Sequence, residues 1–153
     1  MAEIIVAIRR LLEAERHVDR LLCRYLADLA DRIESRAAYD LGGFSDVYHA
    51  SRCLFDLTVR RTRECIRIGR ALRTLPQVER AFIEGRLAFS RVREVTRVAR
   101  AADETQWLRL ASELHMRVLE RRVAEASGSA AADPRTSDAA DVEWKTPDAS
   151  RCG

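Results

Sequence analysis

LTVRRTRECIRIGRALRTL, residues 57 to 75, is the stretch that decides the fold. It begins with Thr58 at a favourable N-cap position and reaches Pro76 with no proline and a single glycine, Gly69. On a helical wheel the small and apolar residues share one half of the circumference: Val59, Thr62, Cys65, Ile66, Ile68, Gly69 and Leu72. We therefore predict a helix whose small apolar side is buried in a core.

Arginines occupy the other half of this helix. Four of them lie within about 80° of one another on the wheel: Arg60, Arg63, Arg67 and Arg70. From Thr58 through Arg73 the sequence has six arginines and one acid, Glu64. Adjacent guanidinium groups repel one another, so this row favours an anionic partner such as DNA. An ordinary solvated face is the alternative.

The composition indicates an all-α protein. Of 153 residues, 47% are hydrophobic, which is enough for a core, and 33% are charged, which suits helices with extensive surface. Aromatic residues make up only 6%, and runs of Val, Ile, Thr and Tyr that are typical of strands are absent.

Positive charge is concentrated in the middle third of the chain. The formal net charge is −2 for residues 1–51, +8 for 52–100 and −3 for 101–153, which together give the +3 of the whole chain. A local excess of this kind can supply the sequence-independent part of nucleic-acid affinity.

Residues 3–37 predict one long helix, because they contain neither Gly nor Pro. Apolar residues recur at spacings of three and four, with Glu15 filling one gap: Ile4, Ile8, Leu11, Val18, Leu22, Tyr25, Leu29 and Ile33. Packing of this stripe against the chain's own helices is one interpretation, and pairing with a second chain in a homodimer is the alternative. The acids on this helix are expected to be solvated: Asp19, Asp28, Asp31 and Glu34.

A helix-turn-helix outline follows the long helix. The segment DLGG at 40–43 predicts a break, and Ser45 is the predicted N-cap of a short helix over 46–56. Only Leu57 and Thr58 separate that helix from the arginine-bearing one. Residues 44–75 therefore have the outline of a helix-turn-helix unit.

Short helices are predicted for the rest of the domain. Pro76 begins a helix over 77–84 that Gly85 ends, and Ser90 caps one over 91–102.

Asp103 and Gln106 predict a capping box for the helix after that one. The last helix is predicted at 116–126. From residue 127 onward the pattern is small, polar and aperiodic. We therefore expect a helical domain over 1–126 and a disordered tail or linker over 127–153.

The sequence predicts no enzyme active site. His17, His49 and His115 lie on separate predicted helices, and motifs of hydrolases, P-loops and dinucleotide sites are absent. We identify no catalytic residue and no metal ligand, and we expect no cofactor.

Cysteine usage and hydropathy bear on location. Cys23, Cys53 and Cys65 fall on or beside apolar helix faces, where we expect buried, reduced thiols. Neither a signal peptide nor a membrane-spanning run is visible, so we expect a cytoplasmic protein that does not enter a membrane.

The order of motifs over residues 37–125 resembles the helical N-terminal region of bacterial HNH endonuclease-like proteins, a family long described as a domain of unknown function. The matching pieces, in order, are Gly43-Phe44 with Tyr48, Leu57-Thr58 with Arg60 and Thr62, Leu75-Pro76, Gly85 with Leu87 and Ser90, and Trp107-Leu108. Residues 57–98 also resemble the helix-turn-helix of chromosome-partitioning ParB proteins.

This resemblance implies DNA binding by the helix after Thr58. It places five residues toward DNA: Thr58, Arg60, Arg61, Arg63 and Arg67. Arg60 and Arg61 would approach base edges or phosphates, and Arg63 and Arg67 the flanking backbone. Arg70 completes the predicted basic surface.

The resemblance does not extend to catalysis. HNH nucleases carry a C-terminal His-Asn-His metal site, and this sequence holds none of it. We therefore expect a DNA-binding module without nuclease activity: a fragment, a frameshifted remnant or a stand-alone relative. The alternative function is a helical dimerisation or protein-interaction module without nucleic-acid binding.

Overall fold

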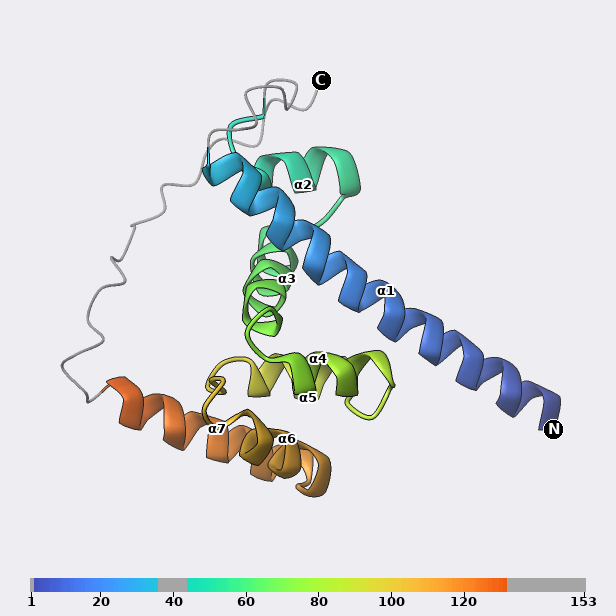
Figure 1. Cartoon of the computed structure of the whole chain (residues 1–153). Helices are drawn as coiled ribbons and strands as arrows, with labels where there is room; N and C mark the ends of the chain where they lie inside the picture. The colour runs from blue at the N-terminus through green and yellow to red at the C-terminus, as the bar shows by residue number, and fades with distance from the viewer. Residues whose placement is uncertain (1, 36–43, 132–153) are drawn as a thin grey trace.

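The computed structural model describes residues 2–35 and 44–131, and this part of the chain is all-α, as predicted (Figure 1). A long first helix is followed by a bundle of shorter ones. The described helices are α1 (Ala2–Glu34), α2 (Val47–Phe55), α3 (Val59–Leu72), α4 (Pro76–Ile83), α5 (Phe89–Val95), α6 (Glu104–Glu113) and α7 (Met116–Ala131).

The core is built around α3, which packs against α1, α2, α4 and α5 (Figure 1). The predicted apolar side of α3 is confirmed, since six of its seven members are buried and Val59 is half-buried. The closest approach is to α1, where a Cβ added to Gly69 would lie 2.1 Å from the Cys23 carbonyl oxygen and 2.9 Å from the Ala27 Cβ. Glycine is needed in this helix because the backbones come so close.

The buried face of α1 differs from the predicted stripe. Its centre is formed by Cys23, Leu26, Ala27 and Ala30, each at most 3% exposed. The stripe residues Leu22, Leu29 and Ile33 lie at the edge of this face and are half-buried, while Tyr25 is exposed. Cys23 and Ala27 are small, which allows α3 to pack closely against this face at Gly69.

The thiols of Cys23 and Cys65 meet in this α1–α3 contact and are both buried, as predicted. Hydrogen bonding to Cys65 and burial raise the pKa of the Cys23 thiol far above its ordinary value. Cys23 is therefore neutral and acts as a small packing residue. The prediction for Cys53 is wrong, because it lies exposed on α2; Cys152 lies outside the described residues.

The turn between α2 and α3 is built by two caps. Asp46, and not Ser45 as predicted, is the N-cap of α2, and its carboxylate accepts 2.8 Å hydrogen bonds from the backbone N–H groups of Tyr48 and His49. Asp56 ends α2 in the left-handed conformation, with φ of 54°. Thr58 caps α3 as predicted, accepting from the Arg61 N–H at 3.2 Å.

The residues predicted to begin and end the next helix, α4, are confirmed. Pro76 is at the start of α4, and Gly85 follows its end with φ of +71°. The N-terminus of α4 has no cap of its own. Glu104 of α6 takes that role, since its Oε1 accepts from the N–H groups of Gln77 at 2.6 Å and Val78 at 2.9 Å. This contact fixes α6 against α4.

The helix predicted over 91–102 is shorter and begins earlier, since α5 spans Phe89–Val95. The Thr96 hydroxyl donates to the Val92 carbonyl at 2.8 Å, and the Arg93 carbonyl accepts from Arg67 of α3 at 2.9 Å. The Arg93 carbonyl is bonded to another helix, and the Arg97 N–H donates instead to the Glu94 carbonyl at 3.1 Å. The regular α-helical hydrogen bonding is therefore interrupted at this point.

Asp103 occupies the predicted N-cap position of α6, but the predicted capping box does not form. The Asp103 carboxylate accepts instead from the Arg100 N–H at 2.6 Å and from the Trp107 indole at 3.2 Å. The end of the last helix also differs from the prediction. Helix α7 runs to Ala131, so the domain boundary predicted at 126 falls within it. Residues 36–43 and 132–153, which include the predicted glycine break and most of the predicted tail, lie outside the described residues.

Candidate functional site

The arginines predicted to bind DNA are divided by the fold into two groups. Arg61 and Arg70 are held by acids of α1, and Arg60, Arg63 and Arg67 remain on the side of α3 away from α1. Thr58, also predicted in this site, is exposed but acts as the α3 N-cap.

Acids of α1 neutralise the C-terminal end of the arginine row. Arg70 Nη2 lies 2.7 Å from Asp31 Oδ1 and 2.8 Å from Glu34 Oε2. The following arginine, Arg73, lies 2.5 Å from Asp31 Oδ2 and 2.7 Å from Asp28 Oδ1. The expectation that these acids are merely solvated is therefore wrong, and Arg70 is not available as a free cation.

The contacts in this cluster shift the pKa values of its members. Hydrogen bonds from Arg73 and then Arg70 hold the pKa of the Asp31 carboxyl below its ordinary value. Conversely, Glu34 raises the pKa of Arg70, and Asp31 raises the pKa of Arg73. The cluster clamps the end of α1 to the end of α3.

Arg61 also faces into the molecule. Its Nη2 lies 2.5 Å from Asp19 Oδ1 of α1, and its guanidinium stacks over the Phe89 ring of α5 at 4.6 Å. Asp19 was another acid expected to be solvated. A guanidinium held in this way, between a carboxylate and an aromatic ring, does not point toward a ligand outside.

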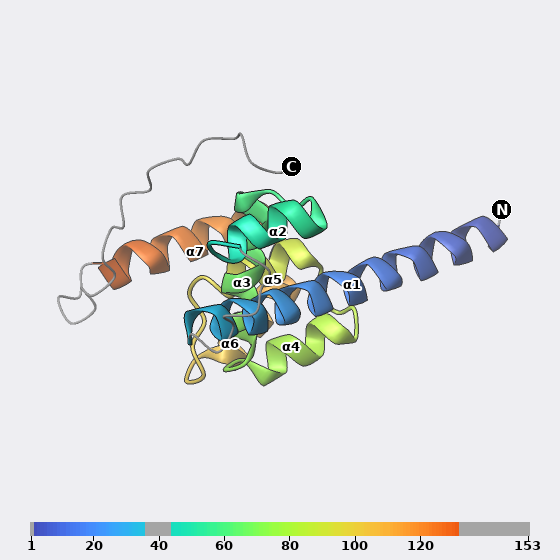
Figure 2. The ribbon, with the colours of Figure 1, turned by 90° about the horizontal axis from the view of Figure 1, so that it is seen from above.

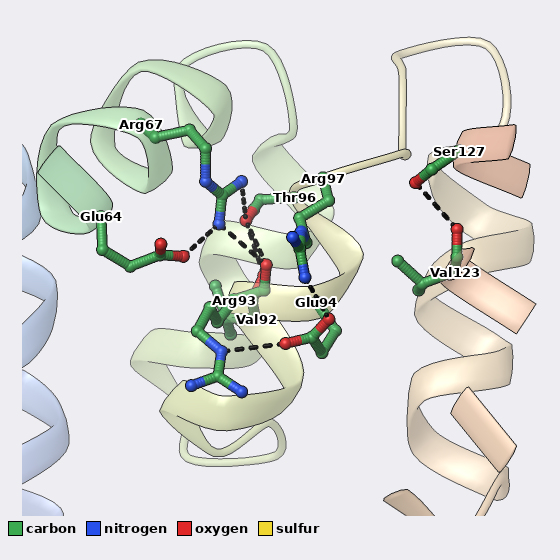
Figure 3. Close-up of polar contacts among 9 residues, drawn as sticks. All are labelled: Glu64, Arg67, Val92, Arg93, Glu94, Thr96, Arg97, Val123 and Ser127. Carbon is green, nitrogen blue, oxygen red and sulfur yellow. Dashed lines mark hydrogen bonds and ion pairs between the residues drawn. The ribbon is translucent and has the colours of Figure 1, made fainter. Parts of the chain in front are cut away.

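Arg67 connects α3 to the end of α5 (Figure 3). Its guanidinium contacts Glu64 Oε1 at 2.6 Å, Thr96 Oγ1 at 3.2 Å and the Arg93 carbonyl at 2.9 Å. Only one of these partners is charged. Arg67 is therefore fixed in position at the surface, and the Glu64 carboxylate offsets its charge.

Arg60 and Arg63 are exposed, and within the described chain neither forms an ion pair. They lie two turns and one turn before Arg67 on the same side of α3. The Arg63 guanidinium lies 5.9 Å from the centre of the Tyr48 ring of α2, a contact that leaves its charge uncompensated.

Sequence reasoning missed the contribution of α5 to this surface. Glu94, whose side chain is only 6% exposed, lies 2.9 Å from Arg93 Nε and 3.2 Å from Arg97 Nη1 (Figure 3). A buried carboxylate thus holds two arginines at the surface. The i, i+3 spacing of Glu94 and Arg97 was a usable signal, but their place beside Arg67 depends on the fold.

These residues together form what we call the α3–α5 basic face: Arg60, Arg63, Arg67, Arg93 and Arg97, with Glu64 and Glu94. Five guanidinium groups and two carboxylates leave a formal charge of +3 on it. Guanidinium groups bind phosphate through paired, directional hydrogen bonds. The face is therefore suited to an anionic ligand.

A metal site and a membrane-spanning helix are both absent from the described residues. His17 and His115 are exposed, and the His49 ring is hydrogen-bonded to Ser45. Residues 2–35 and 44–131 contain no group of His, Cys, Asp and Glu side chains that could hold a metal ion. None of the helices in these two ranges has the length and apolar character to cross a membrane.

Fold and site together define an all-α bundle with a basic face. Comparison with protein-family models, with curated proteins and with solved structures found no match for the chain. The resemblance to HNH endonuclease-like and ParB proteins therefore rests on the quoted motifs alone.

Proposed function

We propose that the chain binds nucleic acid, and duplex DNA first of all, through phosphate contacts made by the α3–α5 basic face. The observation that carries this proposal is the pair Arg60 and Arg63, two exposed arginines on one side of α3 that have no carboxylate partner among residues 2–35 and 44–131. Arg67, Arg93 and Arg97 extend the positive surface beside them. All of these groups suit phosphate oxygens spaced along a nucleic-acid backbone.

The proposal includes phosphate contacts only, whereas the sequence also predicts contacts to base edges. Helix α3 packs against four helices, and Arg61 is paired with Asp19 of α1. Insertion of α3 into a groove is therefore not part of the proposal. Phosphate contacts alone carry little sequence information. The expected binding is therefore weak, tolerant of sequence and strongly dependent on salt.

The expected magnitudes follow from counterion release. With at most five phosphate contacts, log K against log salt has a slope no steeper than about −4.5, and Kd at physiological salt lies in the range of about 10⁻⁴ to 10⁻⁶ M. Each arginine removed flattens the slope by about 0.9.

The test compares two double substitutions that remove equal charge. R60A/R63A removes the unpaired arginines, and R121A/R122A removes two exposed arginines of α7 that pair with Glu125. Fluorescence anisotropy with a labelled duplex should show roughly tenfold weaker binding and a slope flatter by about 2 for R60A/R63A only. Equal losses for the two variants, or no binding by the unmodified chain at low salt, would contradict the proposal.

A further inference from the structure

The N-terminal half of α1 carries an apolar surface that no other part of the described chain covers. Every side chain from Glu3 through Glu15 is exposed, and none of them forms a hydrogen bond or ion pair with another helix. Contacts with the bundle begin at Arg16, which donates to the Gly85 carbonyl at 3.1 Å. In Figures 1 and 2 this half of the helix extends well beyond the bundle.

Large apolar residues dominate this segment. Leu11 is 70% exposed and Ile4 is 61% exposed. The exposed set is Ile4, Ile5, Val6, Ile8, Leu11, Leu12 and Val18. A contiguous apolar surface of this kind marks an interaction site. A projecting helix that nothing packs against would also be of marginal stability by itself, because most helical stability in proteins comes from packing of an apolar face.

The charges on this segment favour a second copy of the same chain as the partner. From Glu3 to Arg16 there are three acids and three arginines, so the segment has no net charge and does not repel itself. The stripe of Ile4, Ile8 and Leu11 has spacings of four and three, which suit the seam between two paired helices. Symmetric use of one surface by both chains is the commonest arrangement in homo-oligomers.

Glu15 determines the relative direction of the two helices. It occupies the next seam position after Leu11, so a parallel pair would place the two Glu15 carboxylates against each other. In an antiparallel pair Glu15 lies near Ile4 of the other chain, at the positive end of the partner helix. Figure 2 shows that the bundle lies at one end of α1 and that the N-terminal half projects away from it. An antiparallel pair of these halves would therefore have the two bundles at its opposite ends.

We propose that the segment from Ile4 to Glu15 pairs antiparallel with the same segment of a second chain, forming a two-fold symmetric dimer. The arginines of the α3–α5 basic face take no part in this contact. The dimer proposal can therefore be tested separately from nucleic-acid binding. The two chains of such a dimer each carry one basic face.

Association is tested by sedimentation of the full chain over about a hundredfold range of concentration. The unmodified chain should shift from monomer to dimer as concentration rises. I8D/L11D places two charges in the seam and should stay monomeric throughout, with unchanged helical circular dichroism from the bundle. Q106D/S112D, which adds the same charges on exposed positions of α6, should dimerise like the unmodified chain.

Direction is tested by disulfide cross-linking with an added copper-phenanthroline oxidant. In a background carrying C53S and C152S, I4C and E15C are made in separate chains, one of them tagged to differ in size. An antiparallel dimer links the two variants when they are mixed and links neither variant to itself. Links of I4C to I4C would overturn the antiparallel pairing. A chain that remains monomeric at every concentration, or an I8D/L11D variant that still dimerises, would overturn the dimer.

Discussion

Gly69 is the residue on which the contact between the two central helices depends. It faces Cys23 and Ala27 of α1, and the three together have side chains small enough for one backbone to approach the other. Gly in a helix interior costs about 1 kcal/mol relative to Ala through helix propensity alone. At this position the close packing of α1 and α3 offsets that cost.

We predict that Gly69→Ala destabilises the fold by about 2 kcal/mol or more, because overpacking against a backbone atom exceeds the propensity gain. The new methyl group would lie 2.1 Å from the Cys23 carbonyl oxygen, which cannot move without shifting α1. Urea denaturation at equilibrium measures this loss as a lower midpoint.

Gly128→Ala is the matched control for this substitution. Gly128 is also helical, and a Cβ added there meets nothing within 4 Å. Only the propensity gain applies, so this variant should be stabilised by up to about 1 kcal/mol. A Gly69→Ala variant as stable as Gly128→Ala would show that α1 and α3 do not pack closely.

At the scale of the helices, Glu104 joins α6 to α4, two helices that are not consecutive in the chain. Glu104 is only 3% exposed, and its carboxylate accepts hydrogen bonds from two backbone N–H groups at the start of α4. A carboxylate at a helix N-terminus gains from both the hydrogen bonds and the helix dipole.

We predict that Glu104→Ala lowers the free energy of unfolding by about 2 kcal/mol, since two N–H groups lose their partner. Glu113→Ala is the control, because Glu113 lies exposed on the same helix and should change stability by no more than about 0.5 kcal/mol. Thermal or urea unfolding of the pair measures the difference. Equal stability of the two variants would mean that water caps α4 as well as Glu104 does.

The helices themselves were largely predictable, because their signals are local. Thr58, Pro76 and Gly85 each act on neighbouring backbone groups, and the structure places them as expected. The end of α5 was not predictable, because it depends on Arg67, a residue 26 positions before the Arg93 carbonyl that it binds. No local pattern reports such a contact.

The same reason limits prediction of the basic surface. The wheel correctly grouped Arg60, Arg63 and Arg67, since spacing along one helix fixes their common side. It could not show that Asp31 lies beside Arg70, because the two are 39 positions apart and meet only when α1 crosses α3. Neutralisation by a distant helix is a property of the fold.

At the scale of the whole molecule, α1 consists of two halves with different environments. From Arg16 onward it is clamped to the bundle through Gly85, Glu79 and the acid–arginine cluster at the end of α3. Before Arg16 it is exposed on all sides. One continuous helix therefore serves as a core element along one half and as an extended apolar surface along the other.

We predict that deletion of residues 1–15 leaves the free energy of unfolding of the monomer within about 1 kcal/mol of its original value, since exposed groups away from packing contribute little. The buried residues of α1 begin at Cys23, and the first contact with the bundle, at Arg16, is retained. Urea denaturation followed by circular dichroism, at a concentration where both chains are monomeric, measures the difference. A much lower midpoint for the shortened chain would mean that the first half of α1 folds back on the bundle. The extended helix would then not be its state in solution, and the apolar surface would belong to the core.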